Sequence, residues 1–184
     1  MVDNLSQSIT TNAWHAIYVR SKHEKSVYEV LQLKGIKSSL PLKTVYHQWS
    51  DRKKKKQIPL FRGYVFVNIN IQNEKLDVLQ TDGVVKFIAF GGRNIAIPEA
   101  QMYWLDKLLT ASNTEHEHKF PVGGEVEVIM GPFKGIQGRI KKKQSETRLV
   151  VWFDAIMQGV SVEVDPTWIT PVRIQKNISA IAHV

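Results

Sequence analysis

The chain has 184 residues, enough for one large domain or two small ones, which excludes a long multidomain assembly. Its apolar fraction of 43% and charged fraction of 23% are those of a globular protein and exclude global disorder. The absence of cysteine excludes disulfides, thiol nucleophiles, iron–sulfur clusters and cysteine-ligated zinc. The first twelve residues are polar, and no apolar run approaches the roughly 20 residues that span a bilayer. We therefore expect a soluble, cytoplasmic protein that binds no membrane.

The excess positive charge is confined to one part of the chain. Residues 13–110 carry 16 Lys and Arg against 8 Asp and Glu, whereas residues 121–174 carry 7 against 6. Between them, residues 111–120 (ASNTEHEHKF) are polar and lack apolar periodicity, which is typical of a flexible linker. The pattern predicts a disordered start over 1–12, a basic domain over 13–110, a second domain over 121–174 and a tail over 175–184. The charge favours a polyanionic partner for the first domain, nucleic acid before membrane.

The first half of the basic domain reads as a strand, a helix and a hairpin. Residues 14–20 alternate as a strand, and Ser21 with Glu24 forms a capping-box pattern that predicts the start of a helix. Gly35 is the residue expected to end that helix. An extended stretch over 36–49 and a strong strand from residue 58 flank the run RKKKK. They predict a hairpin with a basic tip.

The second half of the basic domain completes a mixed fold. Asn73 can cap a short helix ending at Leu79, and the run VVKFIAF reads as a further strand. A Gly-Gly turn follows, and Pro98 occupies the first position of a last helix. The order of strand, helix, strand, strand, helix, strand, helix predicts an α+β domain. It is close to a split βαβ fold, an antiparallel sheet with helices over one face.

The second domain has no helical pattern. Five short β-rich runs (VEVIM, GRI, RLVVWF, VSVEV and WITPV) are separated by Gly and Pro residues, which predicts a small five-stranded β-barrel. The spacing of Gly131, Gly135 and Gly138 invites comparison with a phosphate-binding loop. It lacks the Lys-Ser/Thr pair and leads into a strand, so we interpret it as a glycine-shaped hairpin.

Several ordered motifs together resemble one family. The stretch GEVEVIMGPFKGIQGRI resembles the KOW motif, and IPLFRGYVFV, GVVKFIAFGG and IAIPEA are similar to the amino-terminal (NGN) domain of NusG transcription elongation factors. Arg62 departs from the pattern, because the family usually has proline there. The resemblance implies a NGN domain followed by an SH3-like KOW barrel, in a monomer that binds the clamp helices of RNA polymerase and suppresses pausing or termination. It extends to the specialised antiterminators of the RfaH and UpxY type.

Alternation along two strands predicts a docking surface. Ile17, Val19 and the aliphatic residues of strand 64–69 share one face, which suits the helices. Aromatic residues fall on the other face, and an uncovered apolar face marks an interaction site. The family's polymerase-binding positions correspond to Phe61, Tyr64 and Phe90, and the alternation adds Tyr18 and Phe66. The alternative is that these rings are ordinary core, the role that parity assigns to Phe87.

Two basic surfaces are candidates for binding upstream or non-template DNA. One is the run Arg52, Lys53, Lys54, Lys55 and Lys56, whose alternative role is a solvated hairpin end. Adjacent cations repel one another and gain most beside phosphates, whose counterions they release. The other lies around the first helix and comprises Arg20, Lys22, His23 and Lys25. Tyr46, His47 and Trp49 near the hairpin could stack on bases or simply pack.

The barrel carries a candidate partner site of its own. Phe133 lies in a glycine-bounded turn where a large apolar side chain is expected to protrude. The resemblance implies that this aromatic contacts a ribosomal protein or the termination factor Rho.

No catalytic constellation is evident, so we expect a protein that is not an enzyme and uses no cofactor or metal. His116 and His118 lie close together but in the expected linker, where they predict adventitious metal binding at most. A ribosome-associated or RNA-binding KOW protein of translation remains the alternative function. The near-neutral second domain argues against it, because a barrel embedded in ribosomal RNA should be basic.

Overall fold

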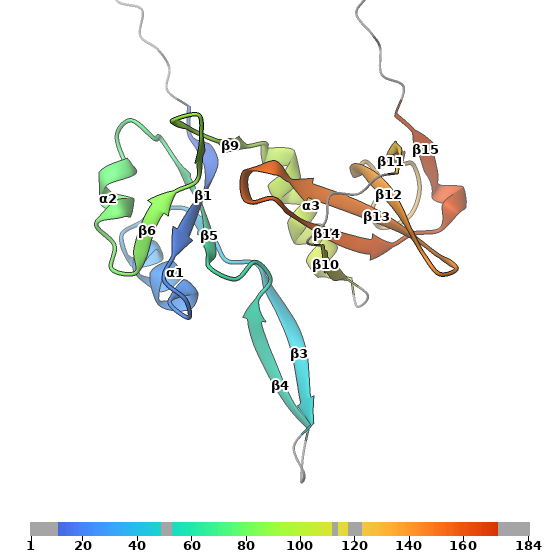
Figure 1. The fold of residues 1–184 in the computed structure, drawn as a ribbon, viewed down its shortest axis with the longest axis horizontal. Helices are drawn as coiled ribbons and strands as arrows, with labels where there is room; N and C mark the ends of the chain where they lie inside the picture. The colour runs from blue at the N-terminus through green and yellow to red at the C-terminus, as the bar shows by residue number, and fades with distance from the viewer. Residues whose placement is uncertain (1–10, 49–52, 112–113, 118–122, 173–184) are drawn as a thin grey trace, which may run out of the picture.

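The computed structural model of the protein describes residues 11–48, 53–111, 114–117 and 123–172. Figure 1 shows an N-terminal unit around β1, a β-rich C-terminal unit, helix α3 beside the latter and a projecting hairpin of β3 and β4. The antiparallel sheets and few helices confirm the expected α+β class. The expected N-terminal segment and tail lie outside the described residues, apart from residues 11 and 12.

The N-terminal sheet has the order β2-β5-β1-β6, with antiparallel pairing throughout. Its strands are β1 (Ala13–Val19), β2 (Ser38–Ser39), β5 (Tyr64–Ile69) and β6 (Val84–Phe87), and β9 (Ala96–Ile97) also pairs with β1. Helices α1 (Glu24–Leu33) and α2 (Lys75–Leu79) contribute to the apolar cluster on the aliphatic face. That cluster includes Phe87, which confirms its expected place in the core.

The start of α1 differs from the expected capping box. His23 is the N-cap residue without a side-chain capping bond, and Lys22 has a φ of 67°. The helix therefore begins three residues after Ser21. The carboxylate of Glu24 is buried and accepts a hydrogen bond from the amide of Gly63 at 2.8 Å. A tertiary partner thus takes the place of the local cap. The end of the helix is as expected, because Gly35 has a φ of 75°.

The hairpin consists of β3 (Leu42–Gln48) and β4 (Lys53–Pro59). The basic run is not confined to a tip as expected, because Lys53–Lys56 form the first half of β4 and pair with residues 45–48. Lys55 and Lys56 are exposed. Trp49 and Arg52 lie outside the described residues, as do the side chains of Tyr46, His47, Lys53 and Lys54.

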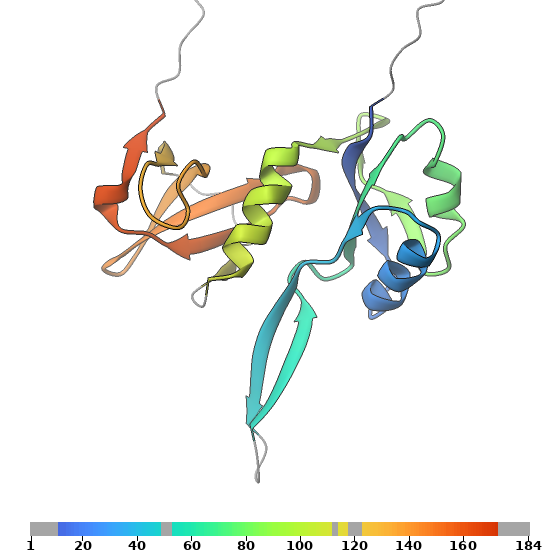
Figure 2. The ribbon, with the colours of Figure 1, turned by 180° about the vertical axis from the view of Figure 1, so that it is seen from behind.

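The chain leaves the N-terminal sheet through a small hairpin and a long helix. The hairpin consists of β7 (Ala89–Phe90) and β8 (Arg93–Asn94). Helix α3 (Glu99–Leu109) follows β9, and Pro98 is its N-cap rather than its first residue. The buried residues of this helix are Met102, Leu105 and Leu108, which lie on one side of it. Figure 2 shows α3 lying along the C-terminal unit.

The C-terminal sheet contains the five expected strands and one more, in the order β10-β14-β13-β12-β11-β15. The five are β11 (Glu125–Val128), β12 (Gln137–Lys143), β13 (Glu146–Phe153), β14 (Gln158–Glu163) and β15 (Ile169–Pro171). Two short 3-10 turns, η1 (Asp154–Ile156) and η2 (Pro166–Trp168), interrupt them. We call this unit the barrel.

The sixth strand lies in the segment expected to be a flexible linker. Residues 115–117 form β10, which pairs antiparallel with β14. The expectation is therefore wrong for this part of 111–120. The polar composition of the segment gave no sign of a strand. Its acidic residues form ion pairs with the barrel, Glu115 with Lys143 and Glu117 with Lys141.

The two domains share one hydrophobic cluster, whereas the change of charge and the polar linker predicted separate bodies. The cluster combines side chains of the N-terminal sheet, of α3 and of the barrel. Its members include Trp14, Ala16, Phe61 and Phe66 from the sheet side, Met102, Leu105 and Leu108 from α3, and Leu149, Val151, Phe153, Val160 and Val162 from the barrel. The side of the sheet opposite α1 and α2 is therefore covered by the barrel and α3.

Candidate functional site: the aromatic face of the N-terminal sheet

The aromatic face comprises Trp14, Tyr18, Phe61, Tyr64 and Phe66. Strand alternation places Trp14 and Tyr18 on the same side of β1, and the register pairs Tyr18 with Tyr64 on β5. The rings of Tyr18 and Tyr64 meet edge to face with centroids 5.7 Å apart, and those of Phe61 and Phe66 do so at 5.9 Å. Four of the five expected polymerase-binding residues, Tyr18, Phe61, Tyr64 and Phe66, thus lie on one side of the sheet.

A tight turn before β5 positions this face. Gly63 has a φ of 80°, and a Cβ placed there would lie 3.0 Å from the Tyr18 ring. Only glycine combines that backbone conformation with such a close ring. The Gly63 amide donates to Glu24, and its carbonyl accepts from the amide of Val19 at 2.8 Å. Two hydrogen bonds therefore tie the turn to α1 and to the end of β1.

The barrel covers the centre of the aromatic face. Phe153 at the end of β13 contacts the rings of Phe61 and Phe66 at centroid distances of 5.6 and 6.3 Å. His116 of β10 meets Phe61 edge to face at 5.2 Å, and its Nε2 lies 2.7 Å from Oε1 of Gln158. As a result Phe61 is 1% exposed and Phe66 is fully buried. Of the expected polymerase-binding residues, Phe61 and Phe66 are therefore interdomain core in this arrangement, the alternative role that the sequence left open.

The edge of the aromatic face stays accessible. Tyr18 is 40% exposed and Tyr64 is half-buried. Burial, and then the proximity of Tyr18, raise the pKa of the Tyr64 phenol above its ordinary value. Tyr64 is therefore neutral near pH 7, and its hydroxyl remains a hydrogen-bond donor. Phe90 stands apart in the β7–β8 hairpin, where it is 82% exposed.

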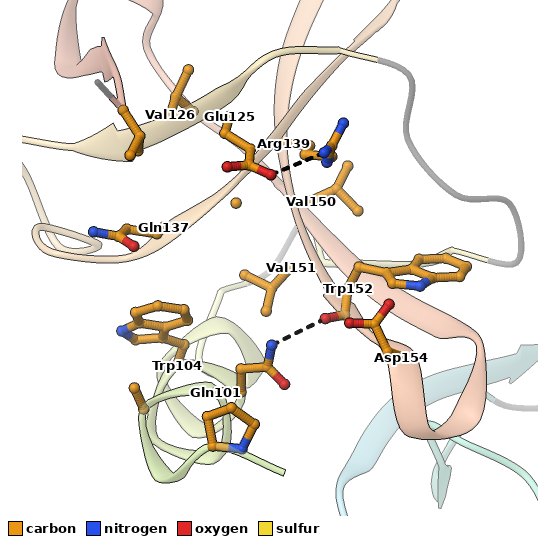
Figure 3. A pocket seen from close by; sticks show the side chains of 14 residues that line it. Gln101, Trp104, Glu125, Val126, Gln137, Arg139, Val150, Val151, Trp152 and Asp154 are labelled. Carbon is orange, nitrogen blue, oxygen red and sulfur yellow. Dashed lines mark hydrogen bonds and ion pairs between the residues drawn. The ribbon is translucent and has the colours of Figure 1, made fainter. Parts of the chain in front are cut away.

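Beside α3 the domain contact leaves a groove of about 490 Å³. Figure 3 shows Gln101 and Trp104 of α3 below it, with Val126, Val151 and Arg139 of the barrel around it. One polar bridge joins the two sides, from the amide nitrogen of Gln101 to the carbonyl of Trp152 at 3.4 Å. The rings of Phe61 and Phe66 also contact the barrel directly, through Phe153.

The second basic candidate surface is exposed. Lys22 and Lys25 are exposed, and Arg20 forms an ion pair with Asp82. The ring of His23 lies over the turn at Gly83, and its Nδ1 is 3.0 Å from the carbonyl of Ser21. His23 is therefore half-buried and packs against this turn.

The barrel candidate Phe133 is half-buried and packs against the shared hydrophobic cluster. It protrudes less than the turn pattern predicted. Two apolar side chains that precede it in the chain are more exposed, Ile129 at 44% and Met130 at 54%.

A metal-binding cluster and a membrane-spanning helix are both absent from the part of the chain that the structure describes. No group of three or more His, Asp or Glu side chains there could hold a metal ion. None of the helices among these residues is both long and apolar enough to cross a membrane.

Comparison with known proteins agrees with this architecture. The family model described as "Transcription termination factor nusG" matches residues 12–105, which is more than half of the chain. The chain belongs to the NusG family. This is a family of transcription factors that act with RNA polymerase, not of enzymes. The structure of a NusG protein from Thermotoga maritima, titled "Domain interaction in Thermotoga maritima NusG", is similar in fold. It has a TM-score of 0.50 at 23% identity, over 88% of this chain and 97% of that chain.

Sequence reasoning missed three residues that shape this NusG-family site. Glu24 was expected to cap α1, His116 was expected to lie in a flexible linker, and Phe153 was only the last residue of an expected strand. Phe153 shares its parity with Leu149 and Val151, which agrees with its buried position. No local pattern indicated that this core continues into the other domain.

The hydrogen bond from Gly63 to Glu24 gives a first prediction. Glu24→Ala should lower the free energy of unfolding by about 1–3 kcal/mol, because it leaves a buried amide without an acceptor. Glu24→Gln keeps an acceptor oxygen and should cost less. Urea denaturation measures both, with Glu29→Ala on the exposed side of the same helix as control, expected within about 0.5 kcal/mol of wild type. Equal stability of Glu24→Ala and Glu29→Ala would refute the role of this bond.

Proposed function

We propose that this NusG-family protein binds the clamp helices of RNA polymerase through its aromatic face and suppresses pausing or termination. The observation that carries the proposal is the clustering of Tyr18, Phe61, Tyr64 and Phe66 on the side of the sheet opposite α1 and α2. Large rings in an apolar patch are the residues that most often supply binding energy at protein interfaces. Phe90, which is 82% exposed on the separate β7–β8 hairpin, supplies a further contact outside this cluster.

The packing of the barrel sets a condition on this function. Phe61 and Phe66 are covered by Phe153, so polymerase can reach them only after the barrel has moved away. Tyr18 and Tyr64 remain partly accessible and supply a first contact. Binding energy at the clamp helices then competes with the energy of the domain contact. The released barrel recruits a further protein, such as a ribosomal protein or Rho, through the surface around Phe133.

A single-round transcription assay on a template with a defined pause tests the proposal. The wild-type chain should shorten the pause, and Tyr64→Ala should abolish most of that effect while the protein stays folded. Tyr103→Ala, which removes an exposed aromatic from α3, serves as the matched control and should act like wild type. Wild-type activity of a folded Tyr64→Ala variant would contradict the proposed interface. Co-purification with ribosomal subunits instead of polymerase would favour the translation alternative.

We further propose that the β3–β4 hairpin and the basic residues around α1 contact upstream or non-template DNA. Replacing Lys53–Lys56 by Ser should reduce the salt dependence of binding to forked DNA. The slope of log K against log salt should fall by roughly 0.7–0.9 for each phosphate that the variant no longer binds. Fluorescence anisotropy at several salt concentrations measures this slope.

The control for the hairpin variant makes the same change of charge elsewhere. It replaces four exposed lysines by Ser: Lys37, Lys86, Lys134 and Lys142. Its slope should change less than that of the hairpin variant. Unfolding should be almost unaffected in both, because exposed charges contribute little to stability. A hairpin variant with an unchanged slope would identify the run as a solvated strand.

A further inference from the structure

The groove between α3 and the barrel belongs neither to the aromatic face nor to the β3–β4 hairpin. Its volume is about 490 Å³, and its apolar walls come from both domains. They are Pro98, Ala100 and Trp104 on the α3 side and Val126, Val150 and Val151 on the barrel side. Figure 3 shows Trp104 and Val126 on opposite sides of the groove. A groove of this size and lining can accommodate several apolar side chains.

The last described residue of the chain lies at the wall of this groove. Val172 lines the barrel side, and its amide donates to the carbonyl of Glu125 at 3.0 Å. Consecutive residues span at most roughly 3.6 Å each, so the Cα atom of Ile174 must lie within roughly 7 Å of that of Val172. The chain that follows Val172 therefore starts beside the groove.

The residues that follow have an amphipathic sequence. Segment 173–184 (RIQKNISAIAHV) lies outside the described residues. Ile174, Ile178 and Ile181 have the spacing of one helix face, within an arc of about 60°, and Lys176 falls on the opposite side. Isolated helices of this length are marginal in water, so a pattern of this kind is stabilised mainly by burial of its apolar face. The groove provides an apolar surface within reach.

The charges of the groove and of the segment are complementary. The lining carries two carboxylates, those of Glu125 and Asp154, and one guanidinium, that of Arg139. Arg139 pairs with Glu125 at 2.9 Å, and Asp154 is exposed. Segment 173–184 contains one Arg, one Lys and no acidic residue. Electrostatic attraction therefore acts in the same direction as apolar burial.

Covalent attachment favours this segment over a separate partner as the occupant. A group joined to its site by a short stretch of chain has an effective concentration in the millimolar range. A partner present at micromolar concentration would need about a thousandfold higher affinity to compete with it.

We propose that segment 173–184 packs Ile174, Ile178 and Ile181 into the groove and so bridges α3 and the barrel. The segment then contacts both domains at once and strengthens the contact between them. This site shares no residue with the aromatic face and does not depend on the polymerase interface proposed above.

The test measures access to the groove with a single thiol, because the chain has no cysteine of its own. Ala100 is exposed and lines the groove, so Ala100→Cys places a thiol there. Its rate of reaction with a bulky maleimide is measured in the full chain with and without Ile178→Ser/Ile181→Ser. These two changes should raise the rate at least about fivefold, because they remove the apolar side chains that hold the segment in the groove.

Two controls separate release of the segment from a general loss of order. Tyr103→Cys places a thiol on the same helix outside the groove, at a side chain that is 57% exposed. Its rate should be the same in both backgrounds. Ser179→Ala/His183→Ser changes the polar side of the segment and should leave the rate of Ala100→Cys at its original value.

A labelled peptide of residues 173–184 identifies the surface that is bound. Fluorescence anisotropy should show that it binds the Ile178→Ser/Ile181→Ser protein, whose own segment no longer competes. Adding Ala100→Arg places a bulky side chain in the groove and should weaken peptide binding at least about fivefold. Tyr103→Arg adds the same charge outside the groove and should leave the affinity unchanged.

Four results would overturn the proposal. They are an Ala100→Cys rate that Ile178→Ser/Ile181→Ser does not change in a folded protein, an equal rise for Tyr103→Cys, peptide binding that Ala100→Arg does not weaken, and protection that is lost on dilution. The last result would identify a second copy of the chain as the occupant. If the double serine variant does not fold, Ile178→Ala alone replaces it, and an unchanged rate would be equally decisive.

Discussion

Phe153→Ala should raise the affinity of the full-length chain for core RNA polymerase about tenfold, whereas Phe61→Ala should lower it at least about thirtyfold. Both variants remove one ring from the same edge-to-face contact and so weaken the same domain interface. Opening the interface increases the fraction of molecules able to bind polymerase, which raises the apparent affinity. Only Phe61 is also expected to contact polymerase, and truncating an aromatic anchor costs about 2 kcal/mol or more of binding.

The measurement is a titration of fluorescently labelled core polymerase with each variant. Phe153 is buried in the barrel, so Phe153→Leu, which keeps most of the volume, provides a milder opening variant. Leu149→Ala weakens the barrel core away from the ring cluster and controls for reduced barrel stability. Phe153 and Phe61 variants that both weaken binding would argue against competition between the barrel and polymerase. Wild-type affinity in a folded Phe61→Ala protein would argue against the aromatic face as the polymerase site.

Gly131→Ala should lower the stability of the barrel by about 3–4 kcal/mol, and Gly135→Ala by only about 1–2 kcal/mol. Both glycines have positive φ, 78° and 85°, a conformation that costs an alanine roughly 1–2 kcal/mol. A Cβ at Gly131 would in addition lie 2.3 Å from the ring of Trp168, so this ring would have to move. A Cβ at Gly135 would have open space around it.

Thermal and urea unfolding of the two variants isolates the contribution of the Trp168 contact. Because the backbone strain is similar, the difference between them should be at least about 1 kcal/mol. Gly131→Ala combined with Trp168→Leu should recover part of that difference by giving the new methyl group room. Equal destabilisation by Gly131→Ala and Gly135→Ala would show that the Trp168 ring adjusts freely.

The two-faced character of the N-terminal sheet could be predicted from the sequence. Alternation placed Ile17, Val19 and Val65 on the side that α1 and α2 cover, and the rings on the other side. This succeeds because strand geometry is local, with each residue facing opposite to its neighbour. The end of α1 at Gly35 and the β-rich pattern of the barrel were equally local signals.

Features that depend on partners far away in the chain could not be predicted. The capping pattern at Ser21 and Glu24 was plausible, but Glu24 instead accepts from Gly63, 39 residues away. The polar stretch over 111–120 looked like a linker because its acidic residues gave no sign of the lysines on β12. A strand held by ion pairs to another part of the chain has no apolar alternation to reveal it.

The sequence by itself determined which residues form the aromatic face, and only the tertiary structure decided what covers it. Successive side chains of a strand point to opposite faces, so a few consecutive residues are enough to predict which side chains share a face. Which segment covers the aromatic face depends on the free energy of burying apolar surface, and segments far away in the chain can contribute to it. In this protein that cover is Phe153 and α3, which make the rings of Phe61 and Phe66 part of the interdomain core.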